Sequence, residues 1–168
     1  MKALVVYSSR TGNTRIIAEA IFDSIGFEKE IYPVEEAPSP EGYDFIAVGF
    51  WVNRGKPDEK SGKYMKQIKG KKVGIFATLG AYPTSKHARK ALESARTLLK
   101  ENEILAEFIC QGKIDPAILK RMPKNRAHEM NPYRKKMLEE AAKHPNETDC
   151  LYAQAAFKDV LDDLVERT

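Results

Sequence analysis

Short apolar runs alternate along the chain with segments in which apolar residues recur every three or four positions. The runs around Val48 and Ile75 are continuous, which is typical of strands that are covered on both faces of a sheet. Helical segments separate these runs, and this order predicts parallel strands joined by crossover helices. We therefore predict a three-layer α/β fold with strands at residues 3–6, 31–34, 43–50, 73–78 and 104–110.

The last third of the chain departs from this simple alternation. Asp115-Pro116 and Asn131-Pro132 each pair a capping side chain with a proline, which is typical of helix starts, and a further helix is expected from Thr148 or Asp149. We expect a helical excursion over about 112–148, followed by an amphipathic closing helix that packs on the sheet. Earlier helices are expected after the first strand and over residues 63–69 and 85–99.

The composition is that of a soluble globular protein. With 168 residues, of which 42% are hydrophobic and 31% charged, a single domain over residues 1–168 is expected. The apolar run near the N-terminus is too short for a signal peptide or a membrane span. Cys110 and Cys150 lack the spacing of a zinc or redox pair, which agrees with a reducing compartment. We therefore expect a cytoplasmic protein.

Residues 7–14, Tyr-Ser-Ser-Arg-Thr-Gly-Asn-Thr, connect the first predicted strand to the first predicted helix. The free N–H groups and the positive dipole end of that helix favour an anion at the loop. The loop also offers hydroxyl and amide donors, and its glycine permits close approach of the backbone. We expect it to hold a phosphomonoester through Ser9, Arg10, Thr11, Gly12, Asn13 and Thr14.

Other kinds of phosphate loop are excluded by what is missing. A P-loop or a dinucleotide fingerprint requires further glycines at fixed spacing, whereas Gly12 stands alone. The loop contains no cysteine nucleophile and no carboxylate, and no catalytic acid, base or nucleophile is identifiable in the chain. The three histidines lack partners at the spacing of a metal site, so no metal is expected.

Residues 9–14 resemble the FMN-phosphate loop of the flavodoxin family, T/S-x-T-G-N-T, at every fixed position and in the same strand–loop–helix context. The resemblance covers residues 1 to about 110 and the closing helix, whereas residues 112–148 depart from short-chain members. It implies a doubly wound, flavodoxin-like sheet in the order 2-1-3-4-5, with the ligand beyond the carboxyl ends of the first and third strands. It also implies FMN as the cofactor.

In flavodoxins, loops after the third and fourth strands hold the isoalloxazine ring. Trp51 and Tyr82 occupy these places here, where an aromatic side chain can stack on a flavin. Each aromatic could instead cap the core beneath its loop. The resemblance implies ring contacts from Trp51, Asn53, Arg54, Gly55, Thr78, Gly80 and Tyr82.

The formal charge of +4 distinguishes this chain from a family that tends to be acidic around the flavin. Cations cluster between Arg54 and Lys72, and a cation near the ring would stabilise a reduced anionic flavin and raise its potential. A second basic run, between Lys120 and Lys136, is either a solvated helix face or a docking surface for an acidic protein partner. The single aromatic of this run and the absence of a reader motif argue against nucleic acid.

Three functions follow from these observations. The predicted one is an electron-transfer protein that passes electrons between redox partner proteins through FMN. The second is an FMN-dependent reductase that acts directly on a small substrate, with the excursion as a lid. The third is a binding module that keeps the flavodoxin fold without the flavin.

Overall fold

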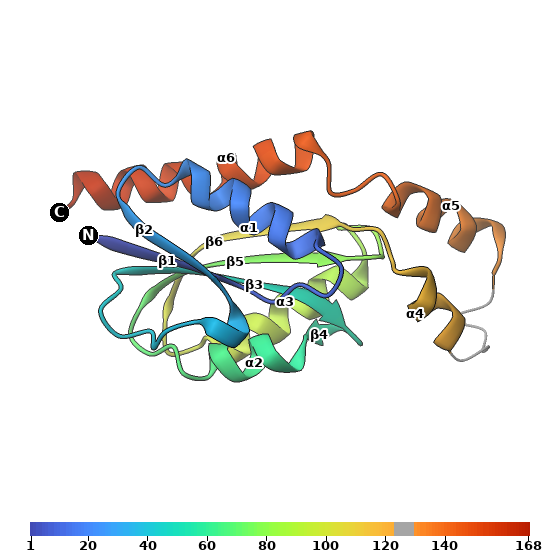
Figure 1. Ribbon diagram of the computed structural model, residues 1–168, viewed down its shortest axis with the longest axis horizontal. Coiled ribbons are helices and arrows are strands. Elements are labelled where there is room, and N and C mark those ends of the chain that lie inside the picture. Colours follow the sequence, from blue (N-terminus) through green and yellow to red (C-terminus); the bar gives the residue numbers. More distant parts are fainter. Residues whose placement is uncertain (123–129) are drawn as a thin grey trace.

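The computed structural model describes residues 1–122 and 130–168 (Figure 1). Within that part of the chain, five parallel strands form a sheet in the order β2-β1-β3-β5-β6. Because β5 and β6 are the fourth and fifth parallel strands, this order confirms the predicted 2-1-3-4-5 arrangement. The strands are β1 (Lys2–Tyr7), β2 (Glu28–Pro33), β3 (Phe45–Asn53), β5 (Lys72–Leu79) and β6 (Glu103–Gln111).

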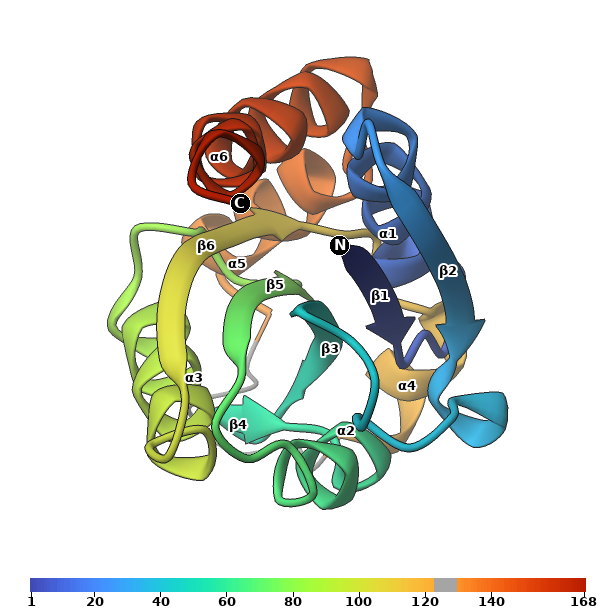
Figure 2. The same ribbon diagram turned by 90° about the vertical axis from the view of Figure 1, so that its left-hand side faces the viewer.

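Helices cover both faces of the sheet (Figure 2). α1 (Asn13–Ser24) and α6 (Glu147–Glu166) lie on one face, and α2 (Glu59–Met65) and α3 (Lys86–Leu98) on the other. The continuous apolar runs send alternate side chains to the two faces, so that Ala47 and Phe76 enter one core and Val48 and Ile75 the other. The pattern in the sequence is therefore explained by a sheet buried on both sides.

Two short helices, α4 (Pro116–Arg121) and α5 (Pro132–Ala141), lie beyond the carboxyl ends of the strands, at the right of Figure 1. They begin where the capping residues predicted. The carboxylate of Asp115 accepts the N–H of Ala117 at 2.8 Å, and the side-chain oxygen of Asn131 accepts that of Arg134 at 2.8 Å. No helix in the described ranges is both long enough and apolar enough to cross a membrane.

Several boundaries differ from those predicted. β3 continues to Asn53 because it forms a hairpin with the two-residue strand β4 (Lys56–Pro57), through a turn in which both Arg54 and Gly55 have positive φ, 52° and 77°. The loop predicted after the third strand, residues 51–57, which we call the first ring loop, is therefore largely a hairpin. α2 begins at Glu59 rather than at residue 63, because Asp58 caps it. α6 begins at Glu147 with Asn146 as its cap, and β2 leads into a short 3-10 helix, η1 (Val34–Glu36).

Replacement of Gly74 by alanine tests how closely α6 packs on the sheet. A Cβ at Gly74 would lie 2.3 Å from Cε1 of Phe157 and 3.1 Å from Cζ of Phe45, so the aromatic rings would have to move. We expect Gly74→Ala to lower the free energy of unfolding by about 1–3 kcal/mol in denaturant titrations. Gly26→Ala is the matched control, because nothing lies within 4 Å of a Cβ there. Equal stability of the two variants would contradict this packing.

Candidate functional site

The loop between β1 and α1 folds around the side chain of Ser9. The Ser9 hydroxyl accepts the backbone N–H groups of Gly12 at 3.1 Å and Arg15 at 3.3 Å, and Gly12 adopts a positive φ of 97°. The first helical N–H groups, those of Asn13 and Thr14, have no acceptor among the described residues. The loop therefore presents two unused donors at the positive end of α1, as an anion site requires.

Thr14 connects this loop to the fourth parallel strand. Its hydroxyl oxygen lies 2.9 Å from that of Thr78 at the end of β5, and both side chains are buried. Either hydroxyl can donate this hydrogen bond. Thr78, which was expected among the ring contacts, therefore lies next to the phosphate loop. Thr11, by contrast, is exposed and lines a cavity beside it.

A buried carboxylate joins the end of β1 to the hairpin. Asp58, only 2% exposed, accepts the hydroxyl hydrogen of Ser8 at 2.7 Å and the N–H of Ser61 at 3.3 Å through the same oxygen, Oδ2. The backbone N–H of Asp58 in turn donates to the carbonyl of Trp51 at 3.2 Å. This carboxylate thus fixes the hairpin and the start of α2 against the residue that precedes the phosphate loop. Asp58 therefore supports the site, although it was not among the residues expected there. Its only signal in the sequence is Pro-Asp-Glu at residues 57–59, a pattern typical of a helix start.

The hairpin that carries Asn53, Arg54 and Gly55 leans on α3. A Cβ at Gly55 would lie 3.3 Å from Cδ of Lys90, a residue of that helix. Trp51 faces the phosphate loop instead, because the guanidinium carbon of Arg10 lies 5.7 Å from the centre of its ring. This cation–π contact brings the first ring segment and the phosphate loop together as predicted from the sheet topology.

The loop predicted after the fourth parallel strand, residues 78–84, which we call the second loop, is covered by the excursion. The side chain of Ile114 fills the space over Gly80, where an added Cβ would lie 2.1 Å from its Cδ1. Tyr82 meets Tyr133 of α5 edge to face, with ring centres 6.1 Å apart. In the structure as described, Tyr82 therefore contacts another tyrosine of this chain.

The segment from the last residue of β6 to the first residue of α4, which we call the strap (residues 111–116), passes beside the phosphate loop. Together with Thr11 and Asn13, strap residues line a cavity of about 230 Å³. The amide of Asn13 donates to the carbonyl of Lys113 at 3.0 Å. These residues lie at the edge of the predicted excursion and were not expected in the site. Asn13 and Lys113 are a hundred positions apart in the sequence, and such a contact has no local signal. The lining residues from the strap are Lys113, Ile114, Asp115 and Pro116.

Ion pairs offset much of the first basic cluster. Lys60 pairs with Glu35 at 2.6 Å, Lys63 with Glu59 at 2.8 Å, and Lys69 with Glu101. In each pair the lysine lowers the pKa of the glutamate through a direct hydrogen bond. Within the described ranges, Arg54 and Lys56 of the hairpin form no ion pair, and neither do Lys66, Lys71 and Lys72. Unbalanced positive charge therefore remains at the hairpin and at the start of β5.

The sheet order, the phosphate loop and the two adjacent segments define a flavodoxin-like protein. Residues 4–158 match the Flavodoxin domain family. The chain is 35% identical, over an alignment of 175 positions, to the flavodoxin-like domain-containing protein BilS of Clostridioides difficile (strain CD3), and the alignment covers 96% of this chain and 97% of that protein. The chain therefore belongs to the flavodoxin family.

Solved structures show the same fold at lower identity. A flavodoxin from the domain Archaea has a TM-score of 0.59 and 17% identity, with 97% of this chain and 98% of that chain covered. A flavoprotein from Lactobacillus acidophilus NCFM, solved in complex with FMN, has a TM-score of 0.55 and 16% identity, with 65% of this chain and 93% of that chain covered. The first of these covers nearly the whole chain.

Removal of the Ser8 hydroxyl tests the buried carboxylate. We expect Ser8→Ala to lower the free energy of unfolding by about 1–3 kcal/mol, because Asp58 would lose a hydrogen-bond donor in a site without access to water. Chemical denaturation measures the change. Ser39→Ala is the control, since Ser39 is exposed and accepts only a long 3.4 Å hydrogen bond. A change at Ser8 no larger than the control would show that the contact does not support the fold.

Proposed function

We propose that this protein binds FMN and carries electrons between redox partner proteins. One observation carries the proposal: in a chain of the flavodoxin family, the N–H groups of Asn13 and Thr14 are unused at the start of α1, beside a cavity lined by Thr11. The FMN in the related Lactobacillus flavoprotein supports the choice of cofactor. When bound, FMN supplies one- and two-electron transfer.

The residues present fit such a cofactor. Ser9 shapes the loop, Gly12 gives it its left-handed turn, and the exposed hydroxyl of Thr11 is available as a donor. We assign the ring to the carboxyl edge of the sheet between the hairpin and the second loop, with Trp51, Asn53, Arg54, Gly55 and Tyr82 around it. A ring contact at Gly80 would require Ile114 to move, because that side chain fills the space over Gly80. Thr78 would affect the cofactor indirectly, through its hydrogen bond to Thr14 of the phosphate loop. The protein would then orient the cofactor and limit its exposure to water.

We propose an acidic docking surface on the redox partner. Exposed cations lie on α4 and α5, beyond the same carboxyl edge as the phosphate loop (Figure 1). Opposite charges increase the rate of encounter between two proteins more than they tighten the complex. Lys124 and Arg126 of the same basic run lie outside the described residues. The described exposed cations are Lys120, Arg121, Lys135 and Lys136.

A cytoplasmic location is part of the same proposal. Cys110 and Cys150 are both free thiols, and burial raises the pKa of each, so both are poor nucleophiles near neutral pH. Free thiols of this kind suit a reducing compartment.

The second candidate is an FMN-dependent reductase that acts on a small substrate. The observation in its favour is the aromatic pair at the second loop, in which Tyr133 is 67% exposed while it contacts Tyr82. Such a surface suits a flat organic molecule. Steady-state turnover with NAD(P)H and a quinone or nitro acceptor would establish the reductase, and its absence in an FMN-loaded protein would favour the carrier.

Replacement of Thr11 tests the phosphate site. We expect Thr11→Ala to weaken FMN binding by about 10- to 100-fold, because a hydrogen bond to a charged group is worth about 1.5–3 kcal/mol. Riboflavin, which lacks the phosphate, should bind equally to both proteins. Titration followed by flavin fluorescence measures the affinities. Equal FMN affinity in the wild type and the variant would contradict the assigned phosphate contact.

Replacement of the hairpin cations tests their effect on the flavin. We expect Arg54→Gln with Lys56→Gln to lower the midpoint potential for full reduction of bound FMN by tens of millivolts, since each exposed charge contributes on the order of 1 kcal/mol or less. Lys63→Gln with Glu59→Gln is the control, because it removes both charges of an ion pair and leaves the net charge unchanged. Spectroelectrochemical titration measures the potentials. A potential that is unchanged, or that rises, would contradict the role of these cations.

A further inference from the structure

The strap is held to the second loop and to the phosphate loop at once. The N–H of Gly112 donates to the carbonyl of Leu79 at 2.8 Å, and the amide of Gln111 donates to the carbonyl of Gly80 at 3.2 Å. On its other side, the carbonyl of Lys113 accepts the amide of Asn13. Gly112 is also in close contact with that amide, because an added Cβ would lie 2.5 Å from its nitrogen. The position of the strap therefore sets the position of the Asn13 side chain.

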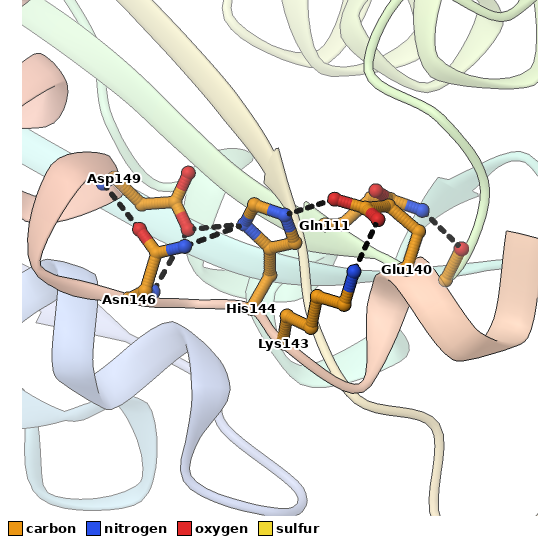
Figure 3. A network of polar contacts seen from close by, with 7 residues as sticks. Gln111, Glu140, Lys143, His144, Asn146 and Asp149 are labelled. Carbon is orange, nitrogen blue, oxygen red and sulfur yellow. Dashed lines mark hydrogen bonds and ion pairs between the residues drawn. The ribbon is translucent and has the colours of Figure 1, made fainter.

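The strap is in turn tied to the connection between α5 and α6. The N–H of Lys113 donates to the carbonyl of His144 at 3.0 Å. The ring of His144 lies between two carboxylates, which together with it form what we call the histidine clasp: Nδ1 is 2.6 Å from Asp149 of α6, and Nε2 is 3.2 Å from Glu140 of α5 (Figure 3). Asn146 and Asp149 cap α6 reciprocally beside it. The clasp thus anchors α5, α6 and the strap at one point.

We infer that His144 is a positioning residue for the phosphate loop: the histidine clasp fixes the strap, the strap fixes Asn13, and the affinity for the FMN phosphate follows from this chain of contacts. The inference rests on the proposed function. It assigns a role in cofactor binding to a residue of the excursion that never touches the cofactor.

The clasp is built to hold a protonated ring. A doubly protonated imidazole donates from both nitrogens, so both carboxylates receive a hydrogen, whereas the neutral ring leaves one nitrogen lone pair facing a carboxylate oxygen. The contact with Asp149, and secondly that with Glu140, raises the pKa of His144 above its ordinary value of 6.5. The clasp is therefore complete below pH 6.5 and loses strength as the pH rises through the raised pKa.

The charged and titratable groups that face His144 come from α5, α6, β6 and the turn after α5. Lys143 and His144 lower the pKa of Glu140, so that carboxyl stays ionised. Asp149 interacts electrostatically with Cys110 of β6 and with Cys150 of α6, and burial raises the pKa of both thiols. Lys143 pairs with Glu140 at 3.1 Å.

The test compares FMN and riboflavin affinities of the full chain between pH 6.5 and 9. For the wild type we expect the FMN affinity to fall by about two- to thirtyfold across this range, because changes along a chain of contacts alter the coupling between two sites by that much. The riboflavin affinity should stay constant. His144→Gln should bind FMN as weakly at pH 6.5 as the wild type does at pH 9, and its affinity should change with pH only as far as the titration of the phosphate changes it. Since the second pKa of a phosphate is about 6, its own titration affects both proteins equally.

Two further variants separate positioning from general stability. Gly112→Ala should weaken FMN binding and remove its pH dependence while the clasp stays intact, because the added methyl group displaces Asn13. Lys158→Ala, which breaks the Lys158–Asp162 ion pair further along α6, should leave both affinities unchanged. Gly112→Ala also keeps the inference testable if His144→Gln does not fold.

The outcomes distinguish this inference from the proposed function. A wild type that binds neither flavin would overturn both. A wild type that binds FMN with an affinity matched by His144→Gln at every pH would overturn the role of His144 alone. Equal loss of FMN and riboflavin affinity in His144→Gln would also overturn it, because a general structural effect does not discriminate between the two flavins.

Discussion

The arrangement of the molecule depends on aromatic rings that pack directly onto strand glycines. Phe157 of α6 lies over Gly74, and Phe76 over Gly49, at distances that leave no room for a Cβ. Phe157 also meets Phe45 and Phe76 edge to face, with ring centres 6.3 and 6.4 Å away. Because this contact fixes α6 close to the sheet, it also fixes the start of that helix, where the clasp is built.

Polar contacts then connect the loops to this apolar framework. Two of these contacts are hydrogen bonds buried at the carboxyl edge. The Ser8–Asp58 bond holds the residue after β1 against the start of α2, and the Thr14–Thr78 bond holds the first turn of α1 against the end of β5. A buried polar group without a partner is costly, and these pairs therefore favour one arrangement of the loops over others. An anion site needs such a rigid frame, since its donors must stay in place when the anion is absent.

The parts of the fold that were predictable are those with local causes. Continuous apolar runs identified the buried strands, and residues 9–14 identified the family through a loop whose context was also correct. Asp115 and Asn131 predicted two helix starts by their capping chemistry. The hairpin was missed because Arg54 occupies a turn position with positive φ. Such positions usually carry glycine, asparagine or aspartate, and arginine has no preference for positive φ. The strap was missed because Ile114 on Gly80 and Lys113 on Asn13 are tertiary contacts with no periodicity.

The cover over the second loop makes the carboxyl edge asymmetric. Ile114 and Tyr133 of the excursion close the side toward β5, whereas on the side toward the hairpin Arg54 is exposed and Arg10 of the phosphate loop contacts Trp51. In the proposed electron carrier, a donor and an acceptor would then use the same side of the carboxyl edge one after the other. A carrier of that kind would alternate between its partners, because the excursion occupies the other side.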